Sequence, residues 1–452
     1  MHVDTGNTAW LLLSSALVLL MTPGLALFYG GLNRSKGTLN MMMMSFSCIG
    51  LISVLWALYG FTLAFGTNSS TGLNKILGSF TQYAGTGTSF IGEEWKVAGT
   101  GTGIPTYVVL AFQMMFAIIT VALISGSLSD RLKFGGWVLF AIGWFTLVYV
   151  PVAHWIWGGG WIGANLGALD FAGGTAVHIN AGSAALAVAL VLGKRIGRPR
   201  ENMRPHNVPF VALGAGLLWF GWFGFNAGSE LTADTIASAA FVNTQLATAA
   251  ALCGWCAVEW IRDGKPTMVG ASSGAVAGLV AITPACGFIP PLASILLGIV
   301  AGVVCALAVS LKYKFGFDDS LDVVGVHFVG GWIGSLWIGL FATAGVNAVV
   351  THKSVFYGGS ADQLWRQFVA SASVTVYSFG VAAILALILK AAKALRVDED
   401  AEVGGIDIAD HGETAYDFSP SGGSGGAFAM AGLSGSPAEA DGKADASTKV
   451  AG

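Results

Sequence analysis

The chain has 452 residues, of which 54% are hydrophobic and only 10% are charged, and its formal net charge is −3. Together with a mean hydropathy of +0.69, this composition excludes an ordinary soluble domain. The small net charge gives no reason to expect a nucleic-acid partner. The sequence therefore predicts a polytopic membrane protein.

Eleven apolar stretches are each about 20 residues long, the length needed to cross a hydrocarbon core about 30 Å thick. They begin near residues 8, 42, 106, 136, 172, 208, 239, 268, 291, 323 and 366. In lipid only a helix or a closed barrel satisfies its own backbone hydrogen bonds, and these stretches are too long to be barrel strands. We therefore expect an all-α membrane protein with 11 transmembrane helices.

The lysines and arginines beside these stretches are divided unequally between the two sides of the membrane. If the first helix runs from outside to inside, only Lys75, Lys96, Lys353 and Arg366 lie outside. The inner side then holds Arg34, Lys36, Arg131, Lys133, Lys194, Arg195, Arg198, Arg200, Arg204, Arg262, Lys265, Lys312, Lys314, Lys390, Lys393 and Arg396. This excess predicts an outer N-terminus and an inner C-terminus in the cell membrane. The first stretch lacks a positive n-region, so we expect a retained helix rather than a cleaved signal peptide.

Three segments are predicted to lie outside the membrane. Residues 67 to 104 form a long outer loop rich in Gly, Ser and Thr, and residues 194 to 207 form a basic inner loop that orients the helices. Residues 397 to 452 form a cytosolic tail with eleven acidic and two basic residues, disordered beyond about residue 420. The transmembrane domain accordingly covers residues 1 to 396.

Glycines are frequent inside the apolar stretches, as in GASSGAVAG (270 to 278) and GIVAG (298 to 302). Small residues at this spacing let helix backbones approach closely, so a tight bundle is expected. The pair Cys253 and Cys256 has the spacing of a thioredoxin motif but lies in an apolar stretch, and we interpret both as packing thiols.

An internal repeat relates two of the predicted helices. DFAGGTAVHINAG, which begins at Asp170, aligns with DSLDVVGVHFVGG, which begins at Asp319. In both copies a histidine follows the aspartate by eight residues, and a glycine follows the histidine by four. The copies lie 149 residues apart, which corresponds to an offset of five helices. An odd offset reverses the direction of the chain and predicts an inverted repeat, the architecture of many transporters.

The expected repeats cover about residues 8 to 194 and 208 to 343, and the last helix, about 366 to 391, is added outside them. Each aspartate lies near a membrane boundary, and eight helical residues rise about 12 Å. Both histidines, His178 and His327, should therefore lie near the middle of the membrane. The two-fold axis of the repeat would bring them close together.

Two interpretations of this histidine pair remain open. The rings could join helices through hydrogen bonds between them, or they could line a polar path, as ionisable groups at this depth usually do. Two neutral imidazoles can share one proton and still bind a small ligand, and burial in an apolar channel favours the neutral form. Asp170 also has two open interpretations, because its carboxylate could cap a helix or draw a cation inward.

Aromatic residues gather in three motifs near the predicted outer ends of the helices. These are AFQMMFA (111 to 117), HWIWGGGW (154 to 161) and WFGWFGFNAGS (219 to 229). Interfacial anchoring alone would spread aromatic residues over both boundaries. Core packing accounts for part of the cluster, while a cluster at a pore mouth could bind a cation through its ring faces.

These motifs, with GVHFVGG and the tail sequence EVGGIDIADHGE, closely resemble the Amt branch of the Amt/Mep/Rh ammonium transporters, over the chain to about Phe418. The resemblance implies an ammonium or ammonia pathway lined by His178 and His327, with methylammonium as an analogue. By matching positions it implies ammonium recruitment by Phe112, Phe116, Trp157 and Ser229, a gate of Phe116 and Phe225, and supporting roles for Asp170 and Trp222. One apparent extra residue between Trp157 and Asp170 departs from the family pattern.

The resemblance also implies a homotrimer in the lipid bilayer and a cytosolic partner of the PII type, which docks at the inner face and tail. A second hypothesis is an ammonium sensor that signals through such a partner. An enzyme, such as an intramembrane hydrolase, finds little support, since neither a nucleophile motif nor a set of metal ligands accompanies the histidines. We therefore expect no cofactor and no metal.

Overall fold

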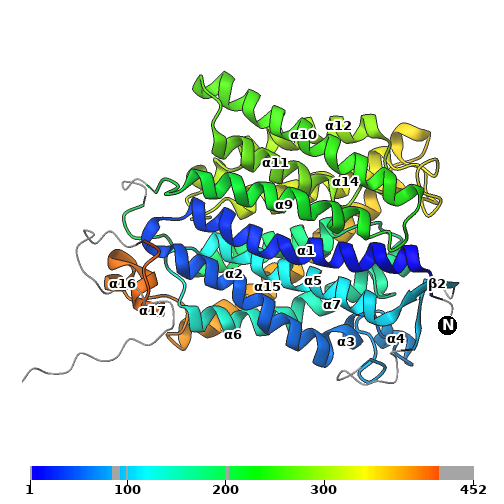
Figure 1. The fold of residues 1–452 in the computed structure, drawn as a ribbon, viewed down its shortest axis with the longest axis horizontal. Coiled ribbons are helices and arrows are strands. Elements are labelled where there is room, and N and C mark those ends of the chain that lie inside the picture. The colour runs from blue at the N-terminus through cyan, green and yellow to red at the C-terminus, as the bar shows by residue number, and fades with distance from the viewer. Residues whose placement is uncertain (1–2, 84–91, 98–99, 199–202, 417–452) are drawn as a thin grey trace, which may run out of the picture. The chain divides into compact units, whose positions relative to one another are not determined.

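The computed structural model describes residues 3–83, 92–97, 100–198 and 203–416, which fold as a bundle of helices (Figure 1). Within these residues, ten helical stretches are long and apolar enough to cross a membrane. A shorter apolar helix, Met268–Ile282, coincides with the predicted stretch that begins near residue 268. Helix is therefore present at every predicted position, while the number of membrane crossings, 11, stays a prediction.

The longer helices follow one another through the whole described chain. They are α1 (Thr5–Leu32), α2 (Thr38–Leu55), α5 (Thr106–Ile124), α6 (Phe134–Trp144), α7 (Val150–Ile156), α8 (Asn180–Leu192), α9 (Val208–Gly228), α10 (Thr235–Asp263), α11 (Met268–Ile282), α12 (Pro291–Ala308), α14 (Val329–Phe341) and α15 (Asp362–Ala391). Short α-helices are α3 (Phe61–Phe65), α4 (Thr71–Asn74), α13 (Leu311–Phe315), α16 (Glu399–Gly404) and α17 (Ile406–His411).

Several stretches are wound more tightly or more loosely than an α-helix. The 3₁₀ turns are η1 (Ser35–Gly37), η5 (Ser125–Leu128) and η10 (Val355–Tyr357). The π-helical turns are η2 (Trp56–Gly60), η6 (Phe145–Tyr149), η7 (Trp161–Leu166), η8 (Gly174–Ile179) and η9 (Val324–Phe328). Turns of the π type are rare and are often found at functional sites.

Side-chain caps define where several helices begin. Asp4 accepts a hydrogen bond from the amide of Asn7 at the start of α1, and Asp234 accepts two at the start of α10. Thr267 does the same for α11. These polar residues satisfy amides that have no partner within the helix, so the local sequence favours each helix start.

Close helix packing occurs where the glycine motifs predict it. A Cβ added at Gly298 or Gly302 of α12 would lie 2.2 Å from a backbone oxygen of α10. Gly278 of α11 faces α10 as well, with 2.6 Å to the side chain of Ala251. The expectation of closely packed backbones is confirmed here, because no larger residue fits at these crossings.

The predicted outer loop contains a strand pair that the sequence did not suggest. Strands β1 (Glu94–Val97) and β2 (Thr100–Pro105) pair in antiparallel fashion, with an irregularity between Glu94 and Lys96. The TGTGIP sequence of β2 has little strand preference, so tertiary contacts hold it. Among these contacts are the Asp4 amide on the Gly103 carbonyl and the ring of Trp95 against Phe61.

At the opposite end of the bundle, helix α17 of the tail packs against α2 and η1, and α16 packs against α17 (Figure 1). The carboxylate of Asp407 accepts hydrogen bonds from the amides of Leu39 and Asn40 at 3.0 and 2.8 Å. Glu402 accepts from Arg396 at 2.8 Å and from the amide of Ile196 at 2.7 Å. The tail is thus attached to the bundle through residue 411, and the predicted disorder beyond about 420 falls outside the described residues.

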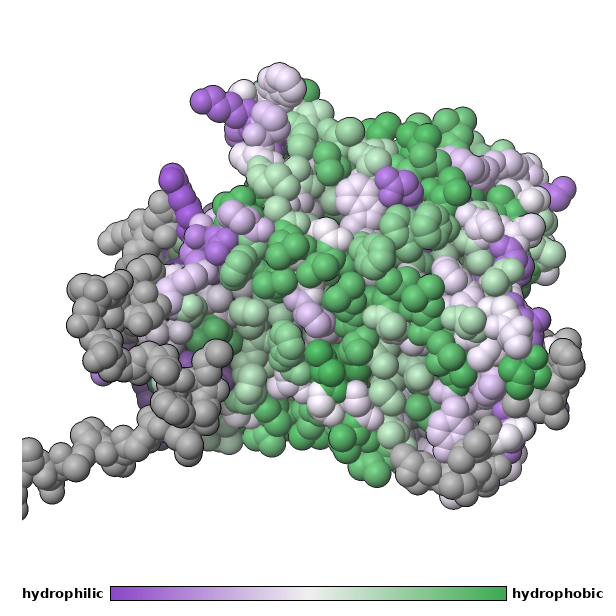
Figure 2. Space-filling view, viewed as in Figure 1, coloured by the Kyte–Doolittle hydropathy of each residue, from purple (hydrophilic) through white to green (hydrophobic). Residues whose placement is uncertain are grey.

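A hydrophobic band crosses the face of the molecule shown in Figure 2, and most hydrophilic residues lie at its two ends. This distribution is expected of a protein whose middle faces lipid. We call the end that carries β1 and β2 outer and the end that carries α16 and α17 inner, following the orientation predicted from the lysines and arginines.

Candidate functional site

The two repeated histidines meet inside the bundle. The Nδ1 atoms of His178 and His327 lie 3.2 Å apart, and their rings are stacked with centroids 5.3 Å apart. Both side chains are buried, with 1% and 2% of their surface exposed. The predicted proximity of the pair is therefore confirmed.

Each histidine lies on a π-helical turn, η8 or η9, that begins beside the repeated aspartate. Asp170 accepts hydrogen bonds at 2.7 to 3.0 Å from the amides of Gly173, Gly174, Thr175 and Ala176. Asp319 accepts from two amides of the second copy and from the hydroxyl of Ser127. Asp170 thus has the capping geometry that its first interpretation requires. Burial raises the pKa of Asp170 despite the four amides.

The repeated glycines lie where the two histidine-bearing segments cross. A Cβ at Gly182 would lie 2.7 Å from the backbone nitrogen of Phe328. A Cβ at Gly331 would lie 3.0 Å from the carbonyl oxygen of Gly174 and 3.2 Å from the Cβ of His178. Glycine at both positions allows the approach that brings the imidazoles together.

The contact between the two Nδ1 atoms fixes complementary proton positions on the rings. In a neutral pair one Nδ1 donates and the other accepts, so one ring carries a free lone pair on Nε2 and the other carries N–H there. Nε2 of His178 is buried and has no hydrogen-bond partner among the described residues. It can therefore bind a small polar ligand, as acceptor or donor according to the tautomer.

A small apolar cavity lies beside this pair. Its volume is about 10 Å³, roughly that of one water-sized molecule. Its wall includes Leu25, Val177 and Trp222 as well as both histidines. The ring of Trp222 stacks on His178 with centroids 5.5 Å apart, and its Nε1 donates to the hydroxyl of Thr283 at 2.8 Å.

Two phenylalanines separate this cavity from a larger one on the outer side. The rings of Phe116 and Phe225 are stacked with centroids 4.1 Å apart. Phe225 lines the small cavity and Phe116 lines the larger one. The stacked pair therefore lies between the two spaces, where the predicted gate would be.

The outer cavity has a volume of about 920 Å³. Trp157 and Ser229 line it, as does Phe116, whose ring meets Trp157 edge-on at 6.0 Å between centroids. The Nε1 of Trp157 donates to the carbonyl of Asp170 at 2.9 Å, which fixes the indole despite the extra residue between them. Phe112 lies against Phe116 at 4.9 Å and is not part of the cavity wall.

The outer cavity also contains residues that sequence reasoning did not single out. Gln113 lines it, and the buried Oε1 of this residue has no hydrogen-bond partner among the described residues. Its position three residues before Phe116 on α5 was a possible signal, since such residues share a helix face. Glu93, just before β1, and Lys96 of β1 also line it, and no motif pointed to them.

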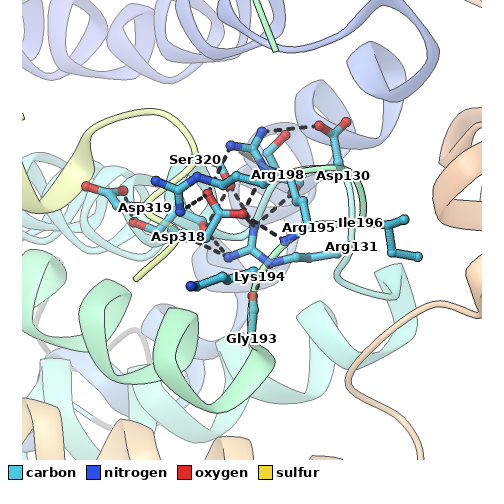
Figure 3. Close-up of polar contacts among 12 residues, drawn as sticks. Asp130, Arg131, Gly193, Lys194, Arg195, Ile196, Arg198, Asp318, Asp319 and Ser320 are labelled. Atoms are coloured by element: carbon cyan, nitrogen blue, oxygen red, sulfur yellow. Dashed lines mark hydrogen bonds and ion pairs between the residues drawn. The ribbon is translucent and has the colours of Figure 1, made fainter. Parts of the chain in front are cut away.

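A buried ion cluster lies at the inner end of the two repeats (Figure 3). Asp318 binds Arg195 at 3.0 Å and Arg198 at 3.0 Å, and Arg195 also reaches Asp130 at 3.4 Å. Burial alone would raise the pKa of Asp318, but the hydrogen bonds and charge of Arg195 hold it well below its usual value. The cluster holds the start of the basic inner loop against the bundle, and the orienting role of this loop stays a prediction. Arg200 of that loop lies outside the described residues.

No group of three or more histidine, cysteine, aspartate or glutamate side chains that could hold a metal ion occurs within the described ranges. The site consists instead of an aromatic outer cavity, a stacked phenylalanine pair and a narrow apolar space beside two histidines. These features lie in sequence inside a bundle of apolar, membrane-length helices.

Comparison with known proteins identifies the family. Residues 9–416 match the model of the Ammonium Transporter Family. An ammonium transporter of Mycobacterium tuberculosis is 55% identical over 442 residues, which cover 93% of this chain and 92% of the relative. An ammonium transporter of Bacillus subtilis is 48% identical over 415 residues, which cover 92% of this chain and 99% of the relative. The chain therefore belongs to the ammonium transporter family.

Solved structures agree with this assignment. The crystal structure of Saccharomyces cerevisiae Mep2 is similar to this chain with a TM-score of 0.79 and 34% identity, over 88% of this chain and 89% of Mep2. A structure described as a sensor Amt protein has a TM-score of 0.79 and 27% identity, over 90% of this chain and 98% of that protein. The matched relatives are transporters rather than enzymes, and the fold is that of the Amt/Mep proteins.

Proposed function

We propose that this protein moves ammonium across the cell membrane by binding the cation in the outer cavity and conducting ammonia past His178 and His327. The contact between the two buried imidazoles, at the end of a path closed by Phe116 and Phe225, carries the proposal. Family membership supports the substrate.

Capture of the cation depends on ring faces and oxygen acceptors. The faces of Phe116 and Trp157 attract a cation, and the partnerless Oε1 of Gln113 can accept one of its N–H bonds. The hydroxyl of Ser229 donates to the carbonyl of Phe225 at 2.8 Å, which leaves its lone pairs for a second N–H. Phe112 supports this site from behind Phe116.

Beyond the stacked phenylalanines the apolar space favours ammonia over ammonium. The cation separates into ammonia, which enters, and a proton, which water in the outer cavity accepts. An ion of similar size that carries no removable proton, such as potassium, cannot shed its charge in this way. Selectivity then results from acid–base chemistry in a narrow apolar tube.

Uptake of methylammonium into liposomes that contain the purified protein tests the proposal. The double variant His178→Ala, His327→Ala should reduce uptake to the level of empty liposomes. The control is His352→Ala, which removes a half-exposed imidazole that is paired with Asp362 and lines neither cavity. Undiminished uptake by the double variant would refute the role of the histidines.

The finer architecture is proposed on the same grounds. Eleven crossings in two inverted repeats of five, with an added last helix, would place the N-terminus outside and the C-terminus inside. Exposed apolar side chains on α10 and α12, such as Phe241, Leu296 and Val300, would contact lipid or neighbouring subunits of a trimer. Chemical cross-linking in native membranes would show three subunits if this is correct.

A sensor is the second candidate function, since one similar structure is described as a sensor Amt protein. The docked tail helices α16 and α17 offer an inner surface for a cytosolic partner of the PII type. Because residues to 411 cap α2, removal of residues 417 to 452 is a cleaner test than removal of the whole tail. Lost partner binding with intact uptake would support docking, and signalling without any measurable uptake would favour the sensor.

A further inference from the structure

The charged residues in the wall of the outer cavity are close together in the sequence. Among the residues that line it, the charged ones are Glu93, Glu94 and Lys96, all in or beside β1. The remaining lining residues are aromatic, apolar, amide or hydroxyl groups, and glycine. Among the described lining residues, the full charges therefore all come from the short segment of residues 93 to 96.

The carboxylates of the two glutamates differ in their hydrogen bonding and exposure. The Oε1 of Glu94 accepts a hydrogen bond from the amide of Gly103 at 2.5 Å, so this carboxylate holds the strand pair together. Glu93 is exposed, and its carboxylate takes part in no ion pair among the described residues. Among the described residues, therefore, no basic side chain pairs with its charge.

The backbone of Glu93 is fixed relative to the aromatic site. Its carbonyl accepts from the amide of Thr106 at 3.0 Å and from the hydroxyl of the same residue at 3.2 Å. Thr106 is the first residue of α5, which carries Gln113 and Phe116 into the cavity. A shared helix thus links the carboxylate to the residues that would bind the cation.

The negative charge of Glu93 acts on neighbouring groups of the cavity wall. The pKa of Tyr83, which also lines the cavity, is raised by burial and further by the negative charge of Glu93, while Gln82 lowers it. A charge that affects a wall residue also acts on a cation inside the same space, because field lines concentrate in a cleft with low-dielectric walls.

We infer that Glu93, just before β1, draws the substrate cation into the outer cavity and that Lys96 of β1 opposes this attraction. The inference rests on the function proposed above and names one residue that strengthens capture and one that weakens it. Neither residue contacts the narrow cavity beside the histidines, so both should affect binding of the cation without affecting its passage.

The test compares Glu93→Gln and Lys96→Gln in methylammonium uptake by reconstituted liposomes at low ionic strength. Both substitutions remove one charge, but of opposite sign. Glu93→Gln should raise KM about two- to tenfold, which is the effect of one charge about 10 Å away in a partly aqueous cavity. Lys96→Gln should lower KM. The double variant should have a KM close to that of the unaltered protein. The maximal rate should stay unchanged in all three variants.

Salt provides the second arm of the test. Both KM shifts should be large at about 0.01 M salt and small at about 0.3 M, because ions screen charges over this range. Asp362→Asn is the matched control, since it removes a carboxylate that is paired with Arg366 and does not line the cavity. KM should not change in this variant.

Three results would overturn the inference: an unchanged KM in Glu93→Gln, a shift of the same sign in both variants, or a fall in maximal rate without a change in KM. Failure of the proposed function is distinguishable from all three. In that case the unaltered protein itself would show no uptake, at either salt concentration.

Discussion

The ring of Phe116 lies flat on the ring of Phe225, with centroids 4.1 Å apart and planes inclined by 17°. One ring faces a cavity of about 920 Å³ and the other a cavity of about 10 Å³. This aromatic contact therefore lies between a space large enough for hydrated cations and one with room for about one small molecule.

Replacing Phe225 by alanine should open this division. Water would enter the apolar space, and ions that keep their hydration shell could follow, because a hydrophobic constriction excludes ions by staying dry. We expect potassium-evoked current in liposomes to rise about tenfold or more over that of the unaltered protein. Phe223→Ala is the control on the same helix, since its ring stacks on Phe241 at 4.1 Å and lines neither cavity. Equal potassium currents in the two variants would contradict a gating role.

The glycines at the crossing of the histidine-bearing segments give a second prediction. Gly182→Ala should lower the free energy of unfolding by about 1 to 3 kcal/mol, since overpacking forces backbone shifts, and the nearest atoms are the backbone nitrogen, the Cα and the Cβ of Phe328. It should also reduce uptake, because the imidazoles move apart. Gly380→Ala on α15 meets no atom within 4 Å and should be neutral or slightly stabilising. Thermal unfolding of both variants in detergent checks this, and equal melting temperatures would refute it.

The parts of this site that the sequence predicts are those encoded by a repeat or by a fixed spacing of residues. The repeat links His178 to His327, and the same alignment marks Gly182 and Gly331, because symmetry requires matching residues at matching places. Helix positions followed from the length of apolar runs. These features are encoded in local spacing.

The features that were missed depend on tertiary contacts. The β1 and β2 strands have no strand-like pattern, and the position of Glu93 follows from a bond to Thr106 rather than from a motif. The π-helical turns at both histidines, η8 and η9, leave no composition signal either. Phe112 of the predicted recruitment site contacts Phe116 with centroids 4.9 Å apart and does not line the cavity, so its part in recruitment stays a prediction.

The contact between the tail and α2 gives a third prediction. The N-cap residue of α2 is Gly37, which has no side chain, and the carboxylate of Asp407 takes its place at Leu39 and Asn40. Asp407→Asn keeps the shape but loses the negative charge at the helix N-terminus, which should weaken tail docking by about 1 kcal/mol.

Hydrogen exchange of residues 397–411 measures this docking. Exchange should become about fivefold faster in Asp407→Asn, as a change of about 1 kcal/mol implies. Asp400→Asn is the control, because Asp400 is an exposed carboxylate on α16. If both variants exchange at the same rate, Asp407 does not hold the tail.

Glu230 gives a prediction about pH. It lies between Ser229 and Leu231, which both line the outer cavity. Burial raises the pKa of Glu230 from 4.5 to about 7, and the charge of Asp234 adds to the shift. The carboxyl is therefore largely neutral below pH 7 and charged above it. Since the folded state binds the extra proton, its contribution to stability is complete at low pH and is lost as pH rises through about 7.

The same titration should affect capture of the cation. Methylammonium stays protonated between about pH 6 and about pH 8, so a change in KM over this range reports on the protein. As the external pH rises, the new negative charge beside Ser229 should lower KM about twofold. Glu230→Gln should remove this dependence, because the amide does not titrate. Asp362→Asn should keep it, since hydrogen bonding to Arg366 lowers the pKa of Asp362 and leaves that carboxylate charged throughout. A KM that changes equally with pH in Glu230→Gln and in the unaltered protein would assign the titration to another group.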